Sequence, residues 1–231
     1  MNSNKPLKLN SRFILPISLF YLTAMLAADV VAYKFVGIDN IVISGATIIF
    51  PFTYLFGDVI AEVYGYNIAK KIIWLGLICE FIFALTIKGI IDLPYASFAN
   101  YGNDFNLILG SMLRFTVGGI IGNIVSSFLN IYLISKWKIL VNGRAFWLRS
   151  IVSTALSELV IIGFAVMIGF TSRMSIEMAF KMIAWAYILE IFYAFIFVWP
   201  AWWLSLYLKK AENIDSYDYG VNYNPFHFAK D

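Results

Sequence analysis

Residues 41–66 read IVISGATIIFPFTYLFGDVIAEVYGY, an apolar run interrupted near its middle by Pro51. A bilayer-spanning helix needs about 20 predominantly apolar residues, and residues 41–63 satisfy that length. A proline inside a helix removes one backbone hydrogen bond and clashes with the preceding turn. The run therefore predicts a transmembrane helix that is kinked or broken near Pro51.

Five more apolar runs are long enough to span a bilayer, at residues 13–33, 68–88, 106–135, 147–170 and 179–208. The 231 residues are 61% hydrophobic and only 13% charged, whereas soluble domains carry about 25% charged residues. Backbone groups in lipid must be hydrogen-bonded within their own element, which favours helices. We expect an all-α polytopic membrane protein with six transmembrane helices, forming one transmembrane domain over residues 1–231. Its core would span residues 13–208, between an N-terminal segment at 1–12 and a C-terminal tail at 209–231.

Basic residues are distributed unevenly between the two sides of this predicted bundle. One side receives Lys5, Lys8, Arg12, Lys70, Lys71, Lys136, Lys138, Arg144, Arg149, Lys209 and Lys210, and the other only Lys34, Lys88, Arg173 and Lys181. Because lysine and arginine are enriched in cytoplasmic loops, we expect both termini in the cytoplasm of a multi-pass protein of the plasma membrane (a bacterial inner membrane). The net charge of +3 is spread over several loops, so nucleic acid is not an expected partner.

Five ionisable side chains lie inside the apolar runs: Asp29, Glu80, Arg114, Glu158 and Glu190. A charge at the centre of a bilayer costs about 2.5–3.5 kcal/mol on insertion scales, so such residues usually pair or mark a pathway for a solute. This pattern is typical of a small membrane transporter. Asp29 is either a site residue or an interfacial carboxylate paired with Lys34, and Glu80 has no local partner in the sequence.

The residues after Pro51 form a polar face. Tyr54, Asp58 and Glu62 recur every four residues and share one side of a helix. They either contribute to a binding site next to the proline, as in the discontinuous helices of transporters, or mark a helix end where Asp58 and Glu62 meet water.

A second polar stripe runs along the fourth predicted span. Arg114, Gly118, Gly122, Ser126 and Asn130 recur every four residues, with Asn123 beside them. Small residues at this spacing allow another helix to approach closely. The stripe is therefore either a helix–helix contact alone or such a contact combined with a binding site. The helix that it contacts could also belong to a second copy of the chain in a homodimer.

The polar residues together suggest the kind of ligand. Carboxylates outnumber the single deep cation, which suits a neutral or cationic ligand with several N–H donors, such as the edge of a guanine or a protonated amine. The lipid bilayer is the other expected partner. The sequence offers one cysteine, one histidine and no hydrolase, zinc-protease or nucleotide-binding motif, so we expect no enzyme activity, no cofactor and no metal site. The candidate substrate-binding residues are Tyr54, Asp58, Glu62, Arg114, Asn123, Asn130, Glu158, Trp185 and Glu190.

Three segments resemble a known family. Residues 50–59, FPFTYLFGDV, with the EVYG run at 62–65, closely resemble the signature of the queuosine precursor transporter family. Trp147, Leu148, Arg149 and Ser153 look like its second signature, and residues 224–226, NPF, are similar to its C-terminal motif. The resemblance implies import of 7-deazaguanine bases, precursors in this tRNA modification pathway, through a central polar cavity.

This sequence also departs from the family pattern. Family members often carry a serine followed by a glutamine where this chain has Ser157 and Glu158. They usually carry a lysine where Glu190 stands. The two glutamates add negative charge to the expected site and suggest a role in selectivity. The alternative function is that of a substrate-binding subunit of an energy-coupling-factor type vitamin transporter, with an ATPase module docked on the face formed by Ala24 and Ala28.

Overall fold

The computed structural model describes residues 11–32, 34–38, 41–94, 102–110, 112–169 and 175–227. Its elements are α1 (Ile14–Val31), β1 (Phe35–Ile38), β2 (Ile41–Ser44), α2 (Ala46–Tyr64), α3 (Tyr66–Ile91), α4 (Gly102–Leu109), α5 (Met112–Leu140), α6 (Phe146–Gly169) and α7 (Ile176–Glu212). In these ranges six helices, all but α4, are long and apolar enough to cross a membrane. The predicted all-α polytopic fold is confirmed.

Large apolar side chains cover the outside of the bundle. Leu15, Phe20, Leu75 and Trp203 are each more than half exposed. Exposing so much apolar surface to water is unfavourable. The outer surface is therefore suited to contact with lipid tails, and the polar side chains discussed below lie inside it.

The second predicted span begins later than expected. Residues 41–44 form strand β2, which pairs antiparallel with β1 in a register from Phe35↔Ser44 to Ile38↔Ile41. Two stretches rich in β-branched residues, FVGI and IVIS, are separated by only two residues, which is a hairpin signal. Assigning residues 41–44 to the helix was wrong because the apolar run was judged by length alone.

Pro51 does not break α2. The helix runs continuously from Ala46 to Tyr64 with Pro51 inside it, so of the two expected outcomes the break is absent, and a kink stays a prediction. The first four N–H groups of a helix have no partner within it. Pro51 is five residues beyond Ala46, so it follows closely on this unpaired first turn. Near that end the proline costs a single intrahelical hydrogen bond, to Thr47.

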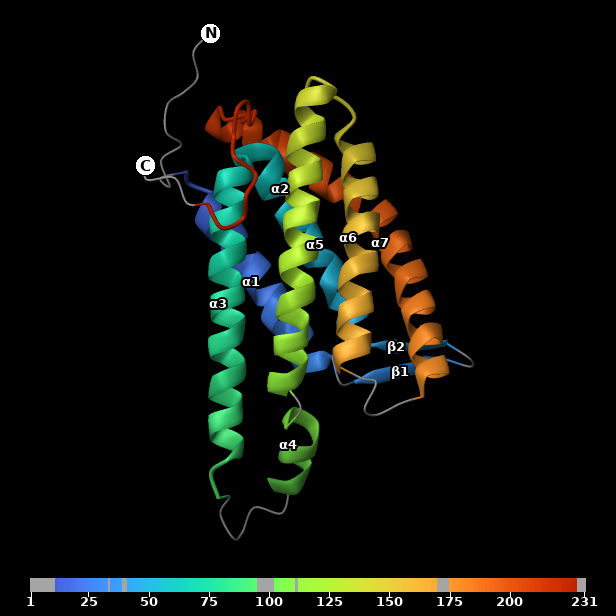
Figure 1. Ribbon diagram of the computed structural model, residues 1–231. Helices are drawn as coiled ribbons and strands as arrows, with labels where there is room; N and C mark the ends of the chain where they lie inside the picture. Colours follow the sequence, from blue (N-terminus) through green and yellow to red (C-terminus); the bar gives the residue numbers. More distant parts are fainter. Residues whose placement is uncertain are drawn as a thin grey trace.

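The fourth predicted span is also divided differently. Residues 106–109 belong to the short helix α4, and α5 extends beyond residue 135 to Leu140. Along its length α5 packs on α6 (Figure 1). A Cβ added at Gly122 would lie 2.8 Å from the Cβ of Phe164, and one at Gly118 would lie 2.5 Å from Ile168. The glycine stripe therefore provides the α5–α6 contact within one chain.

Helix α2 lies at the centre of the bundle, in contact with α1, α3, α5 and α7. The start of α1 and the end of α7 lie at the same end of the bundle, where the Phe13 N–H donates to Oε1 of Glu212 over 2.8 Å. We call this the terminal end. The β1–β2 hairpin lies at the opposite, hairpin end (Figure 1).

Candidate functional site: a cavity with two facing glutamates

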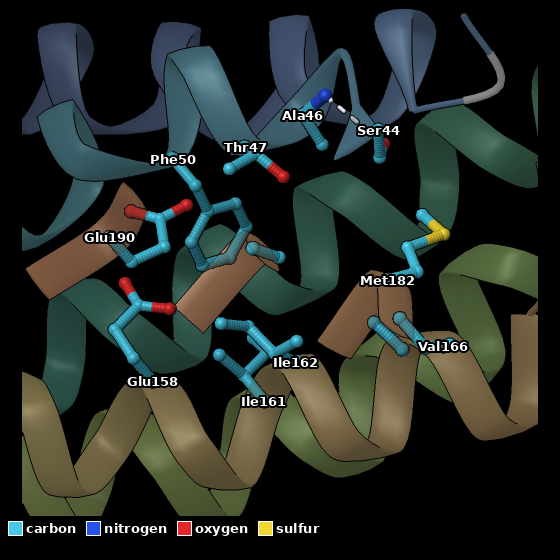
Figure 2. A pocket seen from close by; sticks show the side chains of 12 residues that line it. Ser44, Ala46, Thr47, Phe50, Glu158, Ile161, Ile162, Val166, Met182 and Glu190 are labelled. Carbon is cyan, nitrogen blue, oxygen red and sulfur yellow. Dashed lines mark hydrogen bonds between the residues drawn. The ribbon is translucent and has the colours of Figure 1, made fainter. Parts of the chain in front are cut away.

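A cavity of about 60 Å³ lies between α2, α6 and α7 and reaches β2 at the hairpin end. Figure 2 shows its lining, which is apolar over most of its length. The lining residues are Ser44, Ala46, Thr47, Phe50, Glu158, Ile161, Ile162, Ala165, Val166, Met182, Ala186 and Glu190. A mostly apolar cavity with a few convergent polar groups is the usual form of a small-molecule site.

Glu158 of α6 and Glu190 of α7 face each other at one end of this cavity (Figure 2). Glu158 is 1% exposed and Glu190 is 3% exposed. Among the described residues, neither oxygen of Glu158 has a hydrogen-bond partner, and no lysine or arginine forms an ion pair with either carboxylate. Buried carboxylates without partners are costly. The pair is therefore poised to accept hydrogen bonds or positive charge from a ligand.

A second, smaller cavity of about 20 Å³ adjoins the first at these two glutamates. It is lined by Pro51, Tyr54, Leu55, Asp58, Ser150, Thr154, Glu158, Glu190, Ala194, Phe197, Val198 and Ala201. This volume holds about one water molecule. The structure thus brings Tyr54, Asp58, Glu158 and Glu190, all selected from the sequence, to the lining of one small cavity.

Asp58 differs from the glutamates because its oxygens are already hydrogen-bonded. Nδ2 of Asn130 donates to Oδ1 over 2.6 Å, and the Ser150 hydroxyl donates to Oδ2. The Tyr54 hydroxyl donates to Oγ of Ser126 over 3.3 Å. These bonds link α2 to α5 and α6 at the depth of the smaller cavity, so Asp58 orients the wall of the cavity.

Glu62 lies elsewhere, in a cluster of charges at the terminal end. Its carboxylate accepts from Arg149 over 2.9 Å and from Lys209 over 2.6 Å, with Lys138 3.7 Å away. Asp215, from the segment after α7, pairs with Lys138 over 2.6 Å and with Lys209 over 3.0 Å. We call these five residues the Glu62 ion cluster. Glu62 is 1% exposed, so it neither meets water nor lines either cavity.

The Glu62 ion cluster also fixes the C-terminal segment. Partial burial would raise the pKa of the Asp215 carboxyl, but hydrogen bonds and positive charge from Lys138 and Lys209 outweigh burial and hold that pKa below its ordinary value. Nζ of Lys138 donates to the Ser216 carbonyl over 2.7 Å. The cluster therefore joins α2, α5, α6 and α7 to residues 215–216 and closes the terminal end of the bundle.

Of the remaining predicted site residues, Trp185 and Asn123 lie away from both cavities. Trp185 is partly buried but does not line either of them. Asn123 accepts a hydrogen bond from Ser127, one turn further along α5, over 3.0 Å. Arg114 belongs to α5, and its side chain lies outside the described part of the structure. Asp29 is 5% exposed and accepts from Thr116 over 3.4 Å, so its carboxylate is buried within the bundle.

The sequence analysis missed several residues that line the larger cavity or belong to the Glu62 ion cluster. Phe50, Thr47 and Met182 line the larger cavity, but in sequence they resemble ordinary core residues. Lys138 and Lys209 look like flanking basic residues at the ends of apolar runs, and only the fold turns them toward Glu62. The one available signal was the position of Met182 and Ala186, eight and four residues before Glu190, which places all three on one face of α7.

Comparison with known proteins adds one finding. A family model described as "Putative vitamin uptake transporter" matches residues 44–204. The chain belongs to this family of vitamin uptake transporters. The matched region runs from β2 into α7 and includes both cavities and the paired glutamates. No curated protein and no solved structure matches the chain.

The segment after the matched region packs against this transporter core. Nε1 of Trp74 donates to the Pro225 carbonyl over 2.9 Å, and the rings of Trp74 and Phe226 are 5.5 Å apart. Nζ of Lys70 donates to the His227 carbonyl over 2.6 Å. The NPF sequence at 224–226 therefore anchors the tail to α3.

Proposed function

We propose that the protein imports 7-deazaguanine bases, precursors of queuosine, by binding them between Glu158 and Glu190. The observation that carries this proposal is the pair of buried glutamates that face each other across a cavity, with both oxygens of Glu158 unpartnered. Membership of a transporter family and the sequence resemblance of residues 50–65 support the same class of function.

The chemistry of the lining matches such a ligand. A carboxylate accepts two parallel hydrogen bonds, and the N1–H and 2-amino groups of a guanine-like ring present two parallel donors. Phe50 extends over the cavity (Figure 2) and lies 6.0 Å from the Tyr54 ring. Stacking of a base on an aromatic side chain contributes about 1–3 kcal/mol. One glutamate would bind the ring edge while the second accepts a further donor or a protonated amine.

The volumes of the two cavities imply that side chains must move before a base can bind. The two cavities, about 60 and 20 Å³, are smaller than a fused-ring base and meet at Glu158 and Glu190. Binding therefore requires these side chains to separate and merge the cavities. With both termini in the cytoplasm of the plasma membrane, as the lysine and arginine distribution predicts, the hairpin would face outward. The Glu62 ion cluster would then form the cytoplasmic closure, which must open for release.

The test is binding and uptake by the purified protein. In lipid nanodiscs, precursor bases should raise the melting temperature, whereas adenine and cytosine should not. In liposomes, the same bases should be taken up, and Glu158→Gln and Glu190→Gln should each reduce uptake. Glu177→Gln, at an exposed glutamate of α7 paired with Lys181, is the matched control and should transport normally. Absence of binding and uptake for every precursor and for guanine would exclude this function.

The alternative function is that of a substrate-binding subunit for an ATPase module. The surface expected to dock that module is not exposed. Ala24 and Ala28 are 8% and 2% exposed, so their face is covered within the bundle. Uptake by the protein alone supports an autonomous transporter. Uptake that appears only with an added ATPase module would favour the alternative.

A further inference from the structure

A third cavity, of about 420 Å³, lies apart from the proposed base-binding site, toward the hairpin end. Its described lining residues come from α3, from α5 with the glycine that precedes it, and from α6. They are Lys88, Gly110, Leu113, Val117, Gly118, Ile121 and Ile168. Val117 and Ile121 are nearly half exposed, so this cavity opens on the outer surface of the bundle, where lipid tails lie. We call it the α3–α5 groove.

The groove follows one face of α5. Leu113, Val117 and Ile121 recur every four residues and form one wall. Gly118 has no side chain, and a Cβ there would lie 2.5 Å from Ile168, so α6 lies close enough for Ile168 to form the floor. From Leu113 to Ile121 the helix rises about 12 Å, which is close to the hydrocarbon depth of one leaflet, about 15 Å. The groove therefore matches the length of a lipid acyl chain that lies along the helix.

The one charged side chain among these lining residues lies at the end of a helix. Lys88 belongs to the last turn of α3, and Figure 1 shows that α3 ends at the same end of the bundle at which α5 begins. Lys88 pairs with Asp92, one turn further along, and the two side chains are 40% and 60% exposed. An exposed ion pair of this kind contributes only about 0–1 kcal/mol. Both groups can therefore also bind the headgroup of a lipid.

The headgroup must supply most of the affinity for such a lipid. Lipid tails are as apolar as the lining of the groove, so exchanging one tail for another gains little free energy. The Lys88 ammonium has three N–H donors and suits a phosphate, whereas the ionised Asp92 carboxylate only accepts hydrogen bonds. The pair is thus complementary to a headgroup that carries both a phosphate and a protonated amine.

We propose that the α3–α5 groove binds one phosphatidylethanolamine molecule from the leaflet at the hairpin end. One acyl chain lies along Leu113, Val117 and Ile121, the phosphate accepts from Lys88, and the ammonium donates to Asp92. Phosphatidylcholine offers Asp92 no N–H donor, and phosphatidylglycerol offers it no positive charge. The groove therefore selects the ethanolamine lipid over both. This inference uses no residue of the proposed base-binding site and does not depend on that function.

Native mass spectrometry of the full chain, released from nanodiscs that contain the three phospholipids in equal amounts, tests the headgroup contacts. The wild-type protein should retain one phosphatidylethanolamine under conditions that remove the other two lipids. Lys88→Gln should weaken this retention about tenfold, the lower limit for a hydrogen bond to a charged group, because the site is exposed. Lys181→Gln is the matched control, since Lys181 also pairs with an acid four residues away, Glu177, and should retain the lipid.

Val117→Trp tests the groove itself, because the larger side chain fills it. Val117 is 44% exposed, and Val125, two turns further along α5 and outside the groove, is 47% exposed. Val125→Trp is therefore the matched control. Val117→Trp should lose the bound lipid and Val125→Trp should retain it. Exchanging phosphatidylcholine for phosphatidylethanolamine in the nanodiscs should raise the melting temperature of the wild type and of Val125→Trp, and leave that of folded Val117→Trp unchanged.

Three results would overturn the proposal. The first is retention of phosphatidylethanolamine that is no stronger than that of the other two lipids. The second is unchanged retention in either Lys88→Gln or Val117→Trp. The third is a lipid-free dimer that Val117→Trp converts to a monomer, which would assign the groove to a second copy of the chain. Failure of base uptake would leave all of these measurements unaffected.

Discussion

Replacing Glu158 by glutamine should stabilise the unliganded protein and weaken its binding of ligand. Glu158 is 1% exposed, has no hydrogen-bond partner for either oxygen among the described residues, and faces Glu190 (Figure 2). A buried polar group without a partner costs about 1–3 kcal/mol. Glutamine has the same size and no charge, and its NH₂ group can donate to Glu190.

The expected shift follows from this cost. About 2 kcal/mol, at about 2–4 °C per kcal/mol for a chain of this length, corresponds to a rise in melting temperature of about 4–8 °C. Tryptophan fluorescence in nanodiscs would measure unfolding with and without a saturating 7-deazaguanine base. The base should stabilise the wild-type protein and have little effect on Glu158→Gln. Glu177→Gln, whose side chain is 77% exposed, should change neither measurement.

Two results would contradict this reasoning. A lower or unchanged melting temperature for ligand-free Glu158→Gln would mean that the carboxylate contributes to the stability of the resting protein. A higher melting temperature combined with the full ligand-induced shift would mean that the glutamate is destabilising but does not bind the base.

The other predictions concern the packing of the bundle and its closure. Gly122→Ala should destabilise the bundle by about 1–3 kcal/mol, because its new Cβ would lie 2.8 Å from Phe164. In Gly119→Ala the new Cβ has nothing within 4 Å, so this variant should not be destabilised. Comparison of the two melting temperatures tests this difference. Glu62→Gln should cost about 3–5 kcal/mol, since it leaves buried cations without their carboxylate. In the same melting assay, Lys181→Gln at an exposed ion pair should change stability by only about 0–1 kcal/mol. Asp215→Asn should lower the melting temperature at neutral pH by a modest amount, because Asp215 is 42% exposed. Its pKa is depressed in the folded protein, so the stabilisation is present at neutral pH and is lost as pH falls through that depressed value. The difference from wild type should therefore disappear in acid, and a difference that persists there would exclude an ionic role.

The sequence determined the membrane class and the six helices, because a bilayer imposes a length and a hydrophobicity that can be counted along the chain. It also selected Glu158 and Glu190 as unusual, since a charge within an apolar run is costly wherever the run packs. The glycine spacing in α5 predicted a close helix contact, and the structure shows α6 as the partner. These properties depend on local composition and on the spacing of residues along the chain.

Tertiary structure decided which of the polar residues meet. Tyr54, Asp58 and Glu62 share one face of α2, yet Tyr54 and Asp58 line the smaller cavity while Glu62 is surrounded by Lys138, Arg149 and Lys209. Helical spacing fixes the face of a side chain but not the neighbour that covers it, which depends on how helices far apart in sequence pack.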